Sequence, residues 1–269
     1  MRHAVQFIPI ATTILALAFS VVLFRRWQER GGPHLLWFAL GTLTYAAGTI
    51  TESWTTLFGW NEATFRAWYI TGALMGGAPL AQGSVYLHLK RRTADRLAVA
   101  LVVAIVVASA FVLASPLRYD LVEPYRLTGK VLAWSWVRAF SPFINTYAFC
   151  FLVGGAAVSA WHYSKSLVTR NRFVGNVLIA VGALLPGIGG TFTRFGFTEV
   201  LYVTEFIGLA LIFLGYQMVC RQPSPLSLAQ PIAPASPARR GSAPAVTLRS
   251  PTVTTAAYPM RNSPGSEIR

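Results

Sequence analysis

Seven apolar stretches dominate the first 219 residues of this 269-residue chain. Each is close to the roughly 20 mostly apolar residues that a helix needs to span a bilayer. The chain is 54% hydrophobic and 12% charged, so it lacks the polar surface that a soluble globule requires. We therefore predict an all-α fold, a polytopic membrane bundle of seven transmembrane helices within residues 1–219. The predicted spans are 5–24, 35–56, 65–88, 97–115, 138–162, 173–193 and 200–219.

The last three stretches look like a diverged copy of the first three. Three short patterns recur in the same order on both sides of the fourth stretch. They are FGWNE at 58–62 and FGFTE at 195–199, AxGxL at 39–43 and 180–184, and YIT or YVT at 69–71 and 202–204. This internal repeat predicts a 3+1+3 plan with parallel halves. Repeat one covers about 5–88, the linker helix 97–115 and repeat two about 138–219.

Lysines and arginines are distributed unevenly between the two sets of loops, and this distribution sets the orientation of a membrane protein. Eleven fall on one side and seven on the other. The bias predicts an N-terminus outside and a C-terminus in the cytosol, in a multi-pass protein of the cell membrane, the inner membrane of a bacterium. The eleven are Arg25, Arg26, Arg30, Lys90, Arg91, Arg92, Arg96, Lys165, Arg170, Arg172 and Arg221.

Residues 220–269 differ abruptly in composition, with nine prolines and one acidic residue, Glu267. Such a segment cannot bury enough apolar surface to offset its ordering entropy. We predict a disordered, basic, proline-rich cytosolic tail that contacts anionic lipid, or that docks a cytosolic partner or a second copy of the chain. The net charge of +14 lies mainly in this tail and in the topology-setting loops, so no nucleic-acid partner is expected.

Polar and small residues follow one face of several predicted helices. In the second helix they are Thr42, Tyr45, Thr49, Glu52 and Thr56, and in the sixth Asn176, Ala180, Ala183, Gly187, Gly190 and Arg194. We expect these faces to point into the bundle. Small residues at this spacing also let helices pack closely, which is the structural alternative to a functional role.

Two of the predicted helices contain breaks. The third includes Gly76, Gly77 and Pro79, and the sixth includes Pro186, Gly187, Gly189 and Gly190. Proline removes a backbone donor, so both helices should kink or unwind. The freed carbonyls are tolerated in a membrane only against protein or a water-filled cavity. We therefore predict a cavity between the two halves.

Ionisable and polar side chains gather in the outer third of the predicted bundle, where charges should face inward and pair. The repeat aligns Glu52 with Arg194, which predicts an ion pair across an outer cavity, either as a structural staple or as part of a ligand site. The candidate ligand-binding residues are Glu52, Arg66, Tyr69, Asn145, Arg194 and Glu205.

Nothing in the sequence points to an enzyme. Three histidines, His34, His88 and His162, share one depth and could ligate haem or a metal. They lie at the headgroup level, however, where an amphipathic ring is stable without a ligand. No lysine lies within a predicted span to hold retinal, and no catalytic motif occurs. We expect no cofactor and no metal.

Prolines near the start of the first and fifth helices, Pro9 and Pro142, combine with the 3+1+3 plan to resemble the PQ-loop and SWEET carriers over residues 5–219. Ile10 and Phe143 stand where that family has glutamine, so its functional residues are not carried over. The chain also resembles the seven-helix sensor regions of some bacterial histidine kinases. We expect a carrier that moves a small polar or amphipathic solute by facilitated diffusion; the alternatives are a ligand sensor that signals to a separate cytosolic partner and a ligand-free scaffold.

Overall fold

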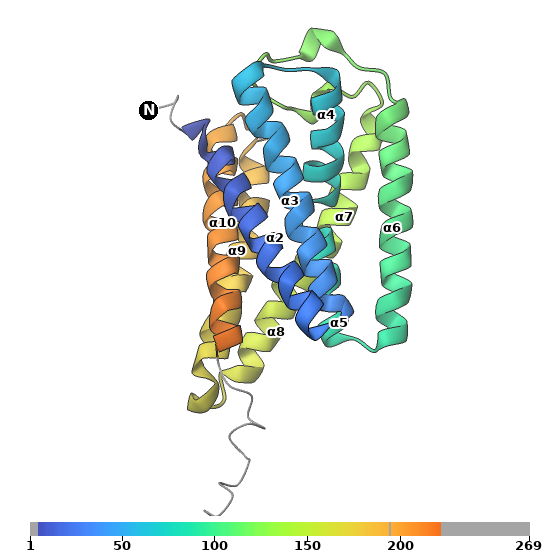
Figure 1. Ribbon diagram of the computed structural model, residues 1–269. Coiled ribbons are helices and arrows are strands. Elements are labelled where there is room, and N and C mark those ends of the chain that lie inside the picture. Colours follow the sequence, from blue (N-terminus) through green and yellow to red (C-terminus); the bar gives the residue numbers. More distant parts are fainter. Residues whose placement is uncertain (1–4, 194, 222–269) are drawn as a thin grey trace, which may run out of the picture. The chain divides into compact units, whose positions relative to one another are not determined.

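The computed structural model describes residues 5–193 and 195–221, and no strand occurs in these two ranges (Figure 1). The predicted all-α fold is confirmed for them. Arg194 and the predicted tail beyond Arg221 lie outside the described residues. The main elements are α2 (Ile8–Arg30), α3 (Pro33–Phe58), α4 (Glu62–Trp68), the π-helix η1 (Tyr69–Met75), α5 (Ala78–His88), α6 (Arg91–Ala114), α7 (Phe140–Ala148), the π-helix η5 (Phe149–Val153), α8 (Gly154–Tyr163), α9 (Arg170–Thr193) and α10 (Thr198–Arg221). Short 3-10 helices occupy Tyr119–Leu121, Gly129–Val131, Ser135–Ala139 and Leu167–Thr169.

Five of the described helices are long and apolar enough to cross a membrane: α2, α6, the continuous run Ser135–Tyr163, α9 and α10. The chain is therefore a helical membrane protein. α3 has 26 residues and is not among these five; its buried face carries Thr42, Thr49, Glu52 and Thr55. The predicted span 65–88 is divided among α4, η1 and α5.

The two ends of the bundle differ in chemistry. We call one the basic end; the turns at 31–32, 89–90 and 164–169 and the C-terminus of α10 lie there. The opposite end holds the turn at 59–61 and the long connection 115–139, which closes over the top of the bundle in Figure 1. At the basic end, Gly31 and Gly32 have φ of 65° and 92°, which lets the chain reverse between α2 and α3 within two residues.

The predicted third helix is interrupted at Gly76 and Gly77, between η1 and α5. This confirms the first of the two expected breaks. Gly76 has a φ of +35°, and Pro79 lies in the first turn of α5, where its missing N–H costs nothing. The π-helical hydrogen bonding of η1 precedes this point directly, as such bulges often do at irregular sites.

The second expected interruption is absent, because α9 continues as an α-helix through Pro186 to Thr193. Proline at 186 deprives the Gly182 carbonyl of its usual donor one turn back. That carbonyl oxygen lies 2.6 Å from the point where a Cβ on Gly208 would stand, and the Pro186 ring lies 3.0 Å from the same point. Close packing on α10 thus covers the site without unwinding α9.

Glycines also decide which face of α9 is buried. Gly175, Gly182 and Gly189 are buried, seven residues apart, whereas Gly187 is exposed and a Cβ on Gly187 or Gly190 would meet nothing within 4 Å. The prediction that Gly187 and Gly190 lie on the inward face of this helix is therefore wrong. The buried face of α9 lies further round the helix, through Gly175, Gly182 and Gly189. Gly182 and Gly175 face Gly208 and Gly215 of α10, and Gly189 faces Thr204 and Leu201, so the two backbones touch.

Helix α6 stands at the edge of the bundle (Figure 1, green). Its valines Val99, Val102, Val103, Val106 and Val107 are exposed, which suits a face against lipid tails. The parallel repeat stays a prediction. Locally, Gly59 and Gly196 both have positive φ, of 85° and 97°, at corresponding places in the two FG motifs.

Candidate functional site

The candidate ligand-binding residues divide into a buried acidic pair and three side chains with local structural partners. Glu52 of α3 and Glu205 of α10 approach each other, although 153 positions separate them. Arg66, Tyr69 and Asn145 lie on α4, η1 and α7. Arg194 lies outside the described residues, so the pair that the repeat predicts with Glu52 stays a prediction.

Arg66 joins α4 to the end of α6. Its guanidinium donates to Glu62 Oε1 at 2.9 Å, to the Leu113 carbonyl at 2.9 Å and to the Ser115 carbonyl at 3.1 Å. The last carbonyls of a helix lack intrahelical donors, and a cation there is favourable. Arg66 thus caps α6 and anchors the start of the connection 115–139.

Glu62 completes this arrangement from the loop side. Its Oε2 accepts a hydrogen bond of 2.7 Å from the Tyr119 hydroxyl, while Oε1 accepts from Arg66. Hydrogen bonds from Tyr119 and then from Arg66 lower the pKa of the Glu62 carboxyl. The carboxylate therefore helps to hold Tyr119, and with it the connection, against α4.

Asn145 and Ser141 of α7 form hydrogen bonds with the irregular backbone of η1. Both donate to the Ala73 carbonyl, Ser141 Oγ at 2.6 Å and Asn145 Nδ2 at 3.2 Å. In a membrane, carbonyls released from regular helical bonding need such partners. Tyr69 is also structural, since its ring is 3% exposed and packs against Phe65.

The acidic pair lies between α3 and α10. Trp68 Nε1 donates to Glu52 Oε1 at 3.0 Å, and the Tyr45 hydroxyl donates to the backbone carbonyl of Glu205 at 3.3 Å. The two Oε2 atoms, of Glu52 and of Glu205, are buried and have no hydrogen-bond donor among the described residues. Buried oxygens without donors are rare and point to a missing proton, ion or water.

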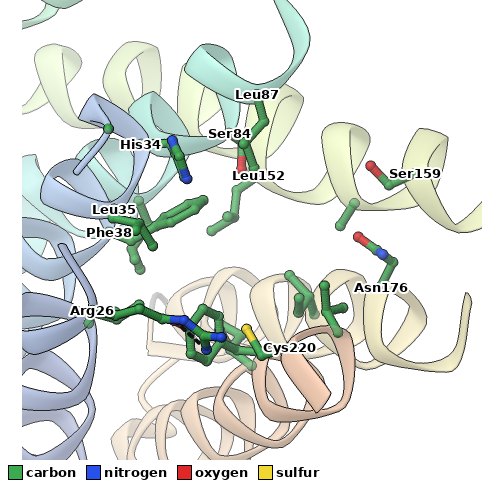
Figure 2. A pocket seen from close by; sticks show the side chains of 18 of the residues that line it. Arg26, His34, Leu35, Phe38, Ser84, Leu87, Leu152, Ser159, Asn176 and Cys220 are labelled. Carbon is green, nitrogen blue, oxygen red and sulfur yellow. Dashed lines mark hydrogen bonds between the residues drawn. The ribbon is translucent and has the colours of Figure 1, made fainter. Parts of the chain in front are cut away.

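A cavity of about 810 Å³ lies at the basic end, between α2, α3, α5, α8, α9 and α10 (Figure 2). None of the five described ligand-binding candidates lines it, so this cavity lies away from the outer third, where the sequence analysis expected one. Its lining residues are Phe19, Leu23, Arg26, Arg30, Gly31, Gly32, His34, Leu35, Phe38, Leu80, Ser84, Leu87, His88, Leu152, Ala156, Ser159, Arg172, Asn176, Ile179, Ile212, Tyr216, Val219, Cys220 and Arg221.

The lining is apolar with cationic groups, and its described residues include no Asp or Glu. Four arginines, Arg26, Arg30, Arg172 and Arg221, contribute to it. Figure 2 shows Arg26 reaching across the cavity toward Cys220, where its Nη1 donates to the Tyr216 hydroxyl at 3.3 Å. That guanidinium keeps further N–H groups for a ligand.

Sequence reasoning assigned these arginines to topology alone. The signal that could have found the cavity is their coincidence with two histidines, His34 and His88, at the same ends of the helices. Positive side chains at one depth on five helices, with apolar residues one turn deeper, are compatible with contact to lipid headgroups. The same pattern also predicts a cavity with a basic entrance and an apolar interior.

Comparison with protein-family models, with curated proteins and with solved structures finds no match. The resemblance to PQ-loop carriers and to sensor regions therefore stays a prediction.

Proposed function

We propose that this protein is a seven-span membrane carrier for a small amphipathic organic anion. The observation that carries the proposal is the cavity of about 810 Å³ between helices of both halves of the chain. Its size falls within the range of small-molecule sites, roughly 300–1,000 Å³. In this reading α3 and the segment α4–η1–α5 supply the two spans beyond the five long apolar helices.

The lining favours an amphipathic solute. Phe19, Phe38, Leu80 and Leu152 offer apolar contact in the interior of the cavity, while Arg30 and Arg221 lie where it reaches the basic end. An anion is favoured over a cation because the described lining holds arginines and histidines and no acidic side chain. Arginine is also the side chain best suited to hold a carboxylate, sulfonate or phosphate through paired hydrogen bonds.

The arrangement also suits alternating access. The cavity reaches the basic end but not the opposite end, where Tyr45, Thr49 and Glu52 of α3 pack inside the bundle. A carrier in one of its two conformations has this form, with its cavity accessible from one side. A scaffold without a ligand has no use for such a cavity.

The test uses the full chain in liposomes loaded with naphthalene sulfonate, a fluorescent amphipathic anion, with naphthylmethylammonium as the matched cation. We expect faster efflux of the anion than from protein-free liposomes and no acceleration for the cation. Arg26→Gln should weaken anion binding about ten-fold or more, since it removes a charge-assisted hydrogen bond. Arg92→Gln is the control, because Arg92 is exposed at the same end and does not line the cavity.

Three outcomes would overturn the proposal in different ways. Saturable binding of the anion without efflux would favour the ligand sensor. Absence of both binding and efflux would favour the scaffold. Preference for the cation, or equal losses in Arg26→Gln and Arg92→Gln, would show that the cavity does not select by charge.

A further inference from the structure

We propose that Glu52 and Glu205 form a proton-binding site in which the two buried carboxyl groups hold one proton between them. The site belongs to the opposite end of the bundle from the cavity and depends on its own geometry, so it stands whether or not the protein is a carrier. It is a binding site for H⁺ built by α3 and α10.

The geometry of the pair leaves room for one more hydrogen atom. Glu52 is 6% exposed, and its Oε1 is occupied by the indole N–H of Trp68. The carboxyl groups of Glu52 and Glu205 lie within hydrogen-bonding reach of each other. Because Oε2 of each residue lacks a donor among the described residues, a carboxylic O–H is the group that can satisfy both.

Among the described residues, the charged and titratable neighbours do not supply a counter-charge. Tyr45 of α3 and Tyr202 of α10 lie near both carboxyls and are neutral hydroxyls, and Glu199, also near Tyr202, adds negative charge. Arg126 is a described cation near Tyr202. Its guanidinium is directed to Glu123 at 3.3 Å and to the Thr193 carbonyl at 3.4 Å. From α2, the Thr13 hydroxyl donates at 2.8 Å to the hydroxyl of Thr49, which lies three residues before Glu52 on α3.

Two carboxylates in contact inside a membrane protein repel each other strongly, and burial adds the cost of desolvating each charge. A shared proton removes one charge and supplies the missing hydrogen bond, as in other close pairs of carboxyl groups. A metal ion would need more ligands than these two side chains, since hard cations take about six oxygens. The described residues contain no group of three or more acidic, histidine or cysteine side chains suited to a metal.

Because the pair lies between α3 and α10, binding or loss of the proton affects how these two helices pack. α3 lies in the first half of the chain and α10 in the second, and the Tyr45 hydroxyl also joins these two helices. Loss of the shared proton would leave two adjacent negative charges and would drive α3 and α10 apart at this end.

The test is infrared spectroscopy of the full-length protein in lipid nanodiscs. A protonated buried carboxyl has a carbonyl stretching band that ionised carboxylates lack, and deuterium exchange shifts it. We expect this band at neutral pH in the parent protein. It should shift or vanish in Glu52→Gln and in Glu205→Gln, vanish in the double variant and stay unchanged in the control Glu123→Gln, whose carboxylate lies in an exposed ion pair.

Melting temperature gives a second readout from the same proteins. A proton bound in the folded state stabilises it at low pH, and the contribution is lost as pH rises. The melting temperature of the parent should therefore fall more steeply with rising pH than that of the double variant. Absence of the infrared carbonyl band from the parent protein at neutral pH would by itself refute the proposal. A Glu52→Gln variant that is destabilised at high pH but matches the parent at low pH would also refute it, because Glu52 would then be ionised in the parent and paired with a cation such as Arg194.

Discussion

The contact between α9 and α10 predicts a large difference between two chemically identical substitutions. A Cβ placed on Gly182 would lie 2.5 Å from the Gly208 carbonyl oxygen and 3.0 Å from Ile212 Cγ1. A Cβ placed on Gly187, five residues along the same helix, would meet nothing within 4 Å. Gly182→Ala and Gly187→Ala therefore differ in packing while sharing the same gain in helix propensity.

The magnitude follows from two opposed terms. Ordinary contact between a methyl group and a carbonyl oxygen needs well over 3 Å, so Gly182→Ala must push the two backbones apart, and overpacking of this kind costs about 1–3 kcal/mol. Replacing glycine by alanine within a helix recovers up to ~1 kcal/mol. We expect Gly182→Ala to lose about 1–2 kcal/mol and Gly187→Ala to be neutral or more stable by up to ~1 kcal/mol.

Thermal unfolding of both variants in the same detergent, followed by tryptophan fluorescence, measures the difference directly. Gly208→Ala is a second test from the partner helix, since its Cβ would lie 2.6 Å from the Gly182 carbonyl oxygen. Equal melting temperatures for Gly182→Ala and Gly187→Ala would show that the two helices do not touch through these glycines. The close packing of Gly182 on Gly208 would then be wrong.

Three further outcomes are expected at the opposite end of the bundle and at the termini. Because the folded-state pKa of Glu62 is lowered, the stability that its carboxylate contributes is present at neutral pH and is lost as pH falls through that pKa. Tyr119→Phe removes one cause of the lowered pKa, so the melting temperature of this variant should fall less steeply with acidification than that of the parent. An unchanged pH profile would refute the hydrogen bond between Tyr119 and Glu62. Ser141→Ala should cost about 0.5–1.5 kcal/mol by removing the 2.6 Å bond to the Ala73 carbonyl, whereas a neutral effect would show that η1 needs no partner there. A tag at residue 2 should be accessible from outside intact cells and one at residue 269 only after permeabilisation, and the reverse pattern would overturn the orientation.

The periodicity of the sequence was sufficient to locate the helices. The predicted spans 35–56 and 200–219 lie inside α3 and α10, and the predicted face through Thr42, Thr49 and Glu52 is buried in the structure. These helices are polar or glycine-rich on one side only, so period 3.6 identifies the inward face.

The face of α9 could not be predicted in the same way, because glycines lie on more than one side of it. Gly182 and Gly187 look alike in sequence, and only the approach of α10 distinguishes them. Pro186 was expected to open the helix, yet its consequence depends on Gly208, a residue 22 positions away.

The pairing of Glu52 with Glu205 was missed for a related reason. The alignment of the repeat suggested a partner of opposite charge, but proximity depends on how α3 and α10 rotate and cross. Sequence analysis expects charges in a membrane to pair with opposite charges. That rule does not predict a pair of acids that share a proton. The buried carboxyl oxygens without donors, which point to such a pair, can be found only in the three-dimensional structure.

Cys220 offers the most direct test of the central claim, that a water-accessible, anion-selective cavity lies at the basic end. This cysteine lines the cavity, whereas the other cysteine, Cys150, is exposed and does not line it. In a Cys150→Ser background, the reaction of Cys220 with two methanethiosulfonate reagents of similar size can be timed, one carrying a sulfonate and one a trimethylammonium group. We expect the anionic reagent to react faster and naphthalene sulfonate to slow it. No reaction with either reagent, or faster reaction with the cationic one, would contradict the account.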